Sequence, residues 1–145
     1  MWQRIQTLYL VLSAGIIAAL FFCPLATVIG ADGQSEVIAF AEKLPYLCLM
    51  ISILTAHVFA LVLFKRRIVQ MRVATIAALL AIGFQIWIGV DYFTAPDSIV
   101  FKVTAVLPLI AGILDIMAVR GIAADQMMVE SMSRLRTSRK NRRRR

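Results

Sequence analysis

Three polar side chains interrupt long apolar stretches of this chain and are the best candidates for chemistry: His57, Gln85 and Asp115. An ionisable group inside a membrane helix is costly, faces the interior of a bundle, and often marks an ion or proton path. A neutral histidine hydrogen-bonded to Gln85 or to another neighbour accounts for the same pattern as a packing contact. The residues therefore allow two interpretations, a structural one and a small transporter or channel subunit.

Asp115 lies about one turn before the end of the fourth apolar stretch. Its carboxylate is expected to reach Arg120, Arg72 or Lys65, because an ion pair lowers the cost of placing a charge near the membrane boundary. We predict a structural pairing here rather than an ion-binding role.

Other kinds of site have little support in the sequence. The single histidine and the two cysteines lack the spacing of metal ligands, so no metal or other cofactor is expected. Cys23 and Cys48 are expected to be buried free thiols, although the sequence leaves a disulfide between them open. No serine, cysteine or carboxylate pair stands near a base, so we predict that the protein is not an enzyme.

The C-terminal segment is strongly basic and contains no acid after Glu130. Its basic residues are Arg134, Arg136, Arg139, Lys140, Arg142, Arg143, Arg144 and Arg145. Such a run repels itself and cannot bury a core, so it is expected to be disordered when free and to bind an anionic partner. Anionic lipid suits it, because each basic residue near the membrane surface contributes about 1 kcal/mol. Ribosomal RNA suits it too, since guanidinium groups bind phosphates in pairs of hydrogen bonds.

The apolar stretches place the chain in a membrane. Of the 145 residues 61% are hydrophobic and only 17% are charged. Four runs, over residues 8–29, 45–64, 73–93 and 99–119, are each long enough to cross about 30 Å of hydrocarbon as a helix. Their continuous apolar character excludes the alternating strands of a membrane barrel. We therefore predict an all-α membrane protein with four transmembrane helices.

Lysines and arginines in the short loops predict the orientation. One side holds Arg4, Lys65, Arg66, Arg67, Arg72, Arg120 and the basic tail, and the other side holds only Lys43 and Lys102. Both termini are therefore expected in the cytoplasm. The first run is too long for an ordinary signal peptide, so we expect it to be retained as a span.

Short loops make consecutive spans antiparallel neighbours, which predicts an up-down four-helix bundle over residues 1–120. Residues 121–145 are expected to form a juxtamembrane helix followed by the disordered arginine-rich tail. Pro24 and Pro108 are expected to kink spans, and residues 37–41 to form a short amphipathic turn. Tyr46, Tyr92 and Phe93 are expected to anchor one membrane interface.

Both ends of the chain carry a family pattern. Residues 1–10, MWQRIQTLYL, resemble the start M-x-Q-R-I-Q-[ST]-[LIV]-[YW]-L of small four-span membrane proteins of unknown function from the Bacteroidota. The segment from Ala118 to Ile122, followed by Asp125 and by residues 133–136, is similar to the post-membrane pattern of that family. The resemblance implies a bacterial inner membrane protein with this layout, and it implies no activity.

The two patterns are expected to meet at the cytoplasmic surface, which would bring together Gln3, Arg4, Gln6, Arg120, Asp125, Arg134 and Arg136. Arg4 is expected to pair with Asp125 or Glu130. The leading hypothesis is a non-enzymatic accessory protein that presents this basic surface to a membrane complex, to anionic lipid or to ribosomal RNA. No small-molecule substrate is indicated.

Overall fold

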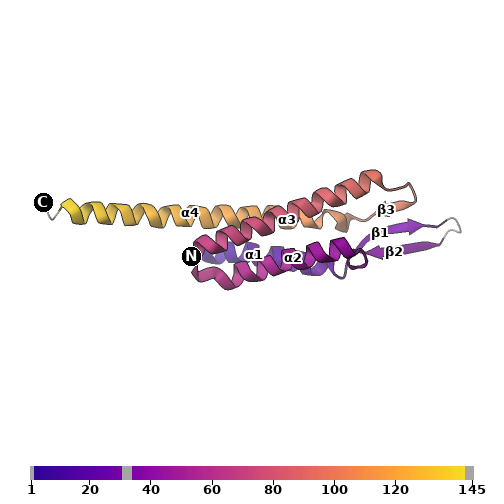
Figure 1. The fold of residues 1–145 in the computed structure, drawn as a ribbon, viewed down its shortest axis with the longest axis horizontal. Coiled ribbons are helices and arrows are strands. Elements are labelled where there is room, and N and C mark those ends of the chain that lie inside the picture. The colour runs from indigo at the N-terminus through magenta and orange to yellow at the C-terminus, as the bar shows by residue number, and fades with distance from the viewer. Residues whose placement is uncertain (1, 31–33, 143–145) are drawn as a thin grey trace.

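The computed structural model describes residues 2–30 and 34–142, and the side chains of residues 5–30, 34–64 and 66–132. In this part of the chain, four α-helices are joined to a small antiparallel sheet (Figure 1). The helices are α1 (Trp2–Leu20), α2 (Leu44–Val62), α3 (Arg67–Thr94) and α4 (Leu107–Arg142).

The four helices lie along one axis and close into a ring (Figure 1). α1 contacts α2 and α4, and α3 contacts the same two helices. The link between α2 and α3, a 3-10 turn over Leu63–Lys65, lies at one end of the bundle (Figure 1). Arg66 and Arg67 follow this turn, and Arg120 precedes Gly121 and Ile122, which lie near Gln6 and Arg67 at the same end. We call this the basic end, and we call the opposite end, which carries the strands, the sheet end.

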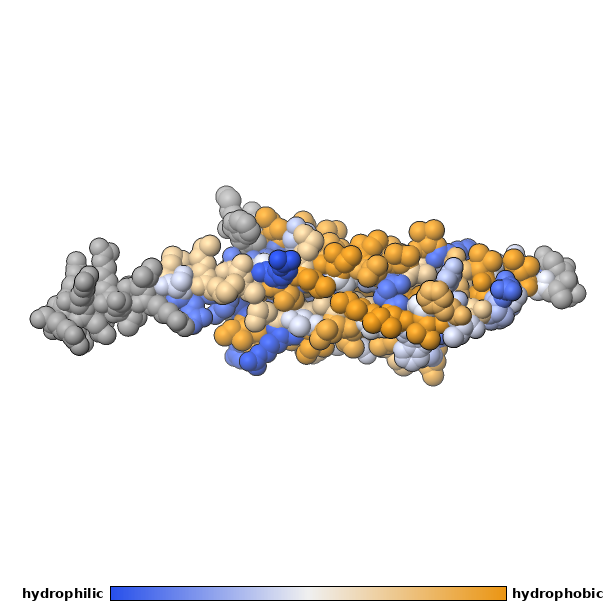
Figure 2. All heavy atoms as spheres, turned by 90° about the horizontal axis from the view of Figure 1, so that it is seen from above, coloured by the Kyte–Doolittle hydropathy of each residue, from blue (hydrophilic) through white to orange (hydrophobic). Residues whose placement is uncertain are grey.

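Three helical segments are long and apolar enough to cross a membrane: Leu44–Val62, Arg67–Thr94 and Val103–Met132. The apolar part of α1, Ile5–Leu20, is shorter and reaches about 24 Å at 1.5 Å per residue. Figure 2 shows hydrophobic residues over most of the bundle, as expected of a surface that faces lipid. The chain thus has the helices of a membrane protein, and the fourth span, by α1, stays a prediction.

Buried residues recur at steps of three or four along every helix. They are Gln6, Leu10, Ser13, Ile17 and Leu20 on α1; Tyr46, Met50, Ile53, His57 and Ala60 on α2; Gln70, Ala74, Ala77, Ala81, Phe84 and Ile88 on α3; and Pro108, Ala111, Asp115, Ala118 and Ile122 on α4. Ala78 and Gly112 are also buried, next to Ala77 and Ala111. This spacing is that of helices packed at a small crossing angle in a bundle. The alanines let α3 approach its neighbours closely.

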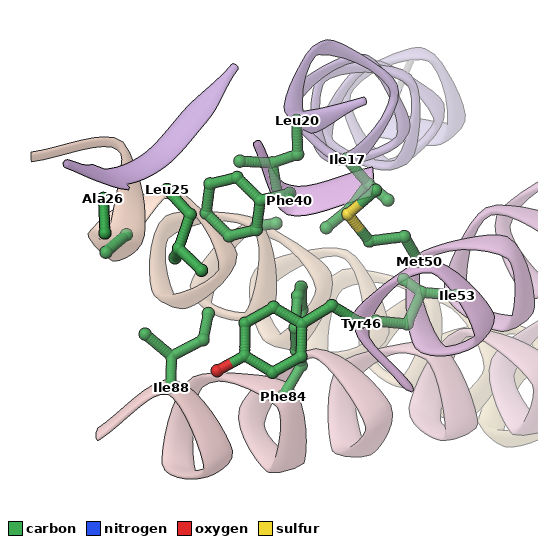
Figure 3. Packing of buried hydrophobic residues seen from close by; sticks show 12 residues of the cluster. Ile17, Leu20, Leu25, Ala26, Phe40, Tyr46, Met50, Ile53, Phe84 and Ile88 are labelled. Carbon is green, nitrogen blue, oxygen red and sulfur yellow. The ribbon is translucent and has the colours of Figure 1, made fainter. Parts of the chain in front are cut away.

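The apolar core is divided into two clusters. The larger one lies near the sheet end and contains an aromatic group of Phe40, Tyr46 and Phe84 (Figure 3). The Tyr46 and Phe84 rings meet edge to face at 5.2 Å between centroids, and the Phe40 and Phe84 rings at 6.2 Å. The smaller cluster, nearer the basic end, consists of Leu10, Ala60, Ala74 and Ala118. A polar layer separates the two.

The sheet was missed by the all-α prediction. Its strands are β1 (Pro24–Ile29), β2 (Ser35–Ala39) and β3 (Ile99–Phe101), in the order β2-β1-β3 with antiparallel pairing. The first helix ends at Leu20, so the predicted span over residues 8–29 is wrong from residue 21 onward. Pro24 begins a strand rather than kinking a helix, because it lacks the N–H that a helix would use. The β-branched residues after it favour extended backbone.

Other boundaries also differ from those predicted. The fourth apolar run divides into β3, a 3-10 turn over Val103–Val106, and the start of α4. Pro108 therefore lies in the first turn of α4, where its missing N–H costs nothing. Residues 37–41 belong to β2 and to a 3-10 turn over Phe40–Glu42.

α4 runs past residue 120 without a break and stays helical to Arg142. The sequence predicted a juxtamembrane helix followed by a disordered arginine-rich tail, and the backbone is one continuous helix as far as Arg142. The helix extends beyond the other three at the basic end (Figure 1). Residues 143–145 lie outside the described part of the chain.

Candidate functional site

The polar layer between the two apolar clusters consists of Ser13 on α1, His57 on α2 and Asp115 on α4. All three side chains are fully buried. The His57 Nε2 atom lies 2.9 Å from Asp115 Oδ1 and 2.9 Å from Ser13 Oγ. On α3, the buried residues between Ala74 of the smaller cluster and Phe84 of the larger one are the alanines Ala77, Ala78 and Ala81.

The hydrogen-bond partners define which atoms carry hydrogens. His57 Nδ1 lies 2.8 Å from the Ile53 carbonyl oxygen, which only accepts, so Nδ1 is a donor. Ser13 donates its hydroxyl hydrogen to the Ala111 carbonyl oxygen at 3.1 Å. The Ser13 oxygen and Asp115 then both act as acceptors from Nε2. The full set of contacts is satisfied by an imidazolium facing a carboxylate, a pair with no net charge.

Asp115 Oδ2 is buried and has no hydrogen-bond partner among the described residues. The predicted pairing of Asp115 with Arg120, Arg72 or Lys65 is wrong, because its carboxylate faces the bundle interior and contacts His57. A buried carboxylate oxygen without a donor is costly. It therefore marks a position where a hydrogen-bond donor would be stabilised.

Ser13 was missed by the sequence analysis, which found no serine near a base. The three residue types are those of a hydrolytic triad, but the arrangement differs. In a triad the serine and the aspartate bind opposite ring nitrogens, whereas here both contact Nε2 and Nδ1 faces the backbone of its own helix. The geometry is thus that of a buried ion pair with a supporting hydroxyl.

Gln85 does not join this layer. Its Oε1 accepts a hydrogen bond from the Leu109 backbone N–H at 3.1 Å, in the first turn of α4. This contact satisfies one of the free N–H groups that begin every helix. The predicted hydrogen bond of His57 to Gln85 is replaced by the bond to Asp115.

At the basic end, Gln6 near the start of the chain and Asp125 on α4 are in contact. Gln6 Nε2 donates to Asp125 Oδ2 at 3.1 Å. A Cβ added to Gly121 would lie 2.9 Å from Gln6 Cγ, so the glycine allows this close approach of α1 and α4. Arg120 is exposed on α4.

The remaining predicted members of this surface fall where side chains are not described. They are Gln3, Arg4, Arg134, Arg136, Arg139, Lys140 and Arg142, whose backbone is helical, and Arg143, Arg144 and Arg145, which lie outside the described residues. The pairing of Arg4 with Asp125 or Glu130 stays a prediction.

An ion pair at the sheet end had no counterpart in the sequence analysis. Lys43 Nζ lies 3.1 Å from Asp91 Oδ2, and the Tyr46 hydroxyl donates to the same oxygen at 2.6 Å. Tyr46 is fully buried in the core, so its predicted role as an interfacial anchor is wrong. Tyr92 and Phe93 are exposed, in agreement with an interfacial position.

Cys23 and Cys48 are both free. Cys23 is half-buried and Cys48 is exposed on the surface of α2, so the prediction of buried thiols is wrong for Cys48. The exposure of each thiol depends on how its segment is rotated in the bundle, and the linear sequence does not give that rotation.

Together, the apolar helices and the buried ion pair define a small α-helical protein with membrane-spanning segments. Residues 2–135 match the family described as Domain of unknown function (DUF4293), and the chain belongs to this family. Comparison with curated proteins gave no match, and comparison with solved structures gave none either.

Proposed function

We propose that this protein is a non-enzymatic accessory protein of the bacterial cytoplasmic membrane. In this proposal α1 is a fourth span, and the basic end and both termini lie in the cytoplasm. The distribution of lysine and arginine supports this orientation, because positive residues near span ends stay on the cytoplasmic side. The partner is a cytoplasmic segment of a larger membrane complex.

The observation that carries the proposal is the length of α4. Its 36 residues extend about 54 Å at 1.5 Å per residue, against about 30 Å of hydrocarbon. The helix is continuous, so about 24 Å of it leads away from the membrane rather than along its surface. A segment placed in this way is directed toward a partner in the cytoplasm.

The projecting part of α4 has an exposed methionine surface formed by Met127, Met128 and Met132. Met128, for example, is 63% exposed. Methionine is flexible and polarizable, and it is common on surfaces that bind other proteins. An apolar surface beyond the membrane is better suited to a protein partner than to water.

The Gln6–Asp125 hydrogen bond supports the same proposal, because it holds α4 against α1 where α4 leaves the bundle. The direction of the projecting helix is thereby set by the N-terminal pattern. The sequence continues after this surface with the basic residues from Arg134 onward. Anionic lipid and ribosomal RNA are the alternative partners of these residues.

Photo-crosslinking in intact membranes tests this function. A photoreactive amino acid at position 128 is expected to crosslink a distinct protein that mass spectrometry identifies. The same group at Leu79, which is exposed on the apolar middle of α3, is the matched control and is expected to give lipid adducts.

The molecule that is crosslinked to position 128 distinguishes a protein partner from RNA, lipid or a second copy of the chain. Crosslinks from position 128 to RNA or to lipid alone would contradict the proposal of a protein partner. Crosslinks only to a second copy of the chain would replace it with self-association.

A second candidate function, proton-coupled transport, is favoured by the unpartnered Asp115 Oδ2 beside His57. Asp115→Asn keeps the shape of the side chain and removes its charge, so it is expected to abolish a flux measured in proteoliposomes with a pH-sensitive dye. Arg72→Gln is the control, because Arg72 is exposed on α3. If the unchanged protein moves no ion or solute over a pH range around the ordinary histidine pKa of about 6.5, this candidate fails.

A further inference from the structure

The last layer of the bundle at the basic end encloses a small hollow. Its volume is about 50 Å³. It is lined by Gln6, Thr7, Phe64, Arg67, Gln70 and Ile122. An arginine and two glutamines in one small space offer several N–H donors, whereas no carboxylate lines it. The hollow therefore suits an anionic group.

Gln70 is the residue that points to a ligand. Its side chain is only 6% exposed, lines the hollow, and makes no hydrogen bond with a described residue. Its amide group lines the hollow and has donors and an acceptor left for a bound group. Arg67 likewise forms no ion pair with any described acid, and the carboxylate of Asp125 is bonded to Gln6.

The N-terminus of α3 adds further donors beside the hollow. The helix begins at Arg67, and its first backbone bond runs from the Gln70 N–H to the Arg66 carbonyl oxygen. Arg66 precedes the helix and supplies no side-chain cap. The N–H groups of the first turn are thus free for an anion, and the helix dipole favours negative charge there.

A second, wider and more open hollow lies beside the first. It has a volume of about 410 Å³ and is lined by Arg66, Arg67, Ile68, Val69 and Gln126. Arg67 borders both hollows, and Ile68 and Val69 are exposed on the outer surface of α3. A charged group beside Arg67 that continues into an apolar segment along Ile68 and Val69 has the shape of a phospholipid.

We propose that the basic end binds the phosphate group of an anionic phospholipid. Arg67 and the first turn of α3 hold the phosphate, the Gln70 amide donates to it or to the attached headgroup, and an acyl chain lies along Ile68 and Val69. This site is separate from the projecting part of α4 and does not depend on the partner proposed for it.

Thermal unfolding of the full chain in detergent tests the site. Added phosphatidylglycerol is expected to raise the midpoint in a saturable way, whereas phosphatidylcholine and inorganic phosphate are expected to have little effect. Arg67→Gln removes the charged ligand and is expected to weaken the response roughly tenfold in lipid concentration. Gln70→Glu keeps the side-chain size, places a negative charge in the hollow, and is expected to do the same.

Arg72→Gln is the matched control, because it removes the same charge from an exposed position on the same helix. Deletion of residues 140–145 separates this site from the basic tail and is expected to leave the response unchanged. An equal response to inorganic phosphate would overturn the lipid assignment. An equal loss in Arg72→Gln, or a loss on deletion of the tail, would show nonspecific attraction and overturn the site.

Discussion

Replacing Asp115 with alanine is expected to lower the free energy of unfolding by about 3–5 kcal/mol, the usual effect of removing one partner of a buried ion pair. His57 would lose its acceptor in a layer that is closed to water. Ser13 alone would face the Nε2 hydrogen, and no other described side chain contacts that nitrogen. Unfolding in mixed micelles, followed by circular dichroism, measures the change.

The double variant His57→Leu and Asp115→Leu provides the decisive comparison. Because both polar groups are then absent, it is expected to be more stable than Asp115→Ala alone. Ser13→Ala is the milder control and is expected to cost about 1 kcal/mol, the value of one neutral hydrogen bond. If the loss of stability in the double variant equals the sum of the losses in His57→Leu and in Asp115→Leu alone, the two residues are not coupled.

Phe84→Ala is expected to cost about 3–5 kcal/mol, as large-to-small changes in a packed core do. Phe84 is fully buried between Phe40, which follows β2, and Tyr46 in the first turn of α2. Its ring therefore joins the sheet to the helices (Figure 3). Loss of the ring leaves a cavity at this junction, and the same unfolding measurement reports it.

Phe93→Ala is the matched control on the same helix. Phe93 is 86% exposed, so its removal is expected to change the free energy of unfolding by less than about 0.5 kcal/mol. Equal effects of the two substitutions would mean that Phe84 does not hold the sheet to the bundle.

Composition predicts the membrane helices because apolar runs of this length are rare outside membrane spans. Composition could not separate the end of α1 from β1, because a hydropathy average that includes Thr27, Val28 and Ile29 stays similar to that of the helix before them. Pro24 and the β-branched residues after it were the available signal for a strand. The pairing of β1 with β3 joins segments far apart in the sequence, and local patterns do not contain it.

His57 and Asp115 were each singled out from the sequence as intramembrane polar residues, but their contact was not predicted, and Asp115 was expected to pair with a basic residue instead. His57 lies five residues before Val62, the last residue of α2, and Asp115 lies five residues before Arg120, which follows the fourth apolar run. The two side chains are therefore at the same depth in the bundle. Ser13 stands three positions after Leu10 and four before Ile17, which was the signal that it faces the same interior. Gln70 continues such a spacing on α3, four positions before Ala74.

The strand order β2-β1-β3 has a consequence for how the chain is assembled. β1 and β2 both belong to the segment between α1 and α2 and are synthesised one after the other. β3 follows α3 and is synthesised some seventy residues later than β1. During synthesis the β1–β2 hairpin is therefore complete while one edge of β1 is still unpaired, and the sheet closes only after β3 has been made. Until then that edge is open to wrong pairing, so the sheet depends on both loops reaching the same end of the bundle.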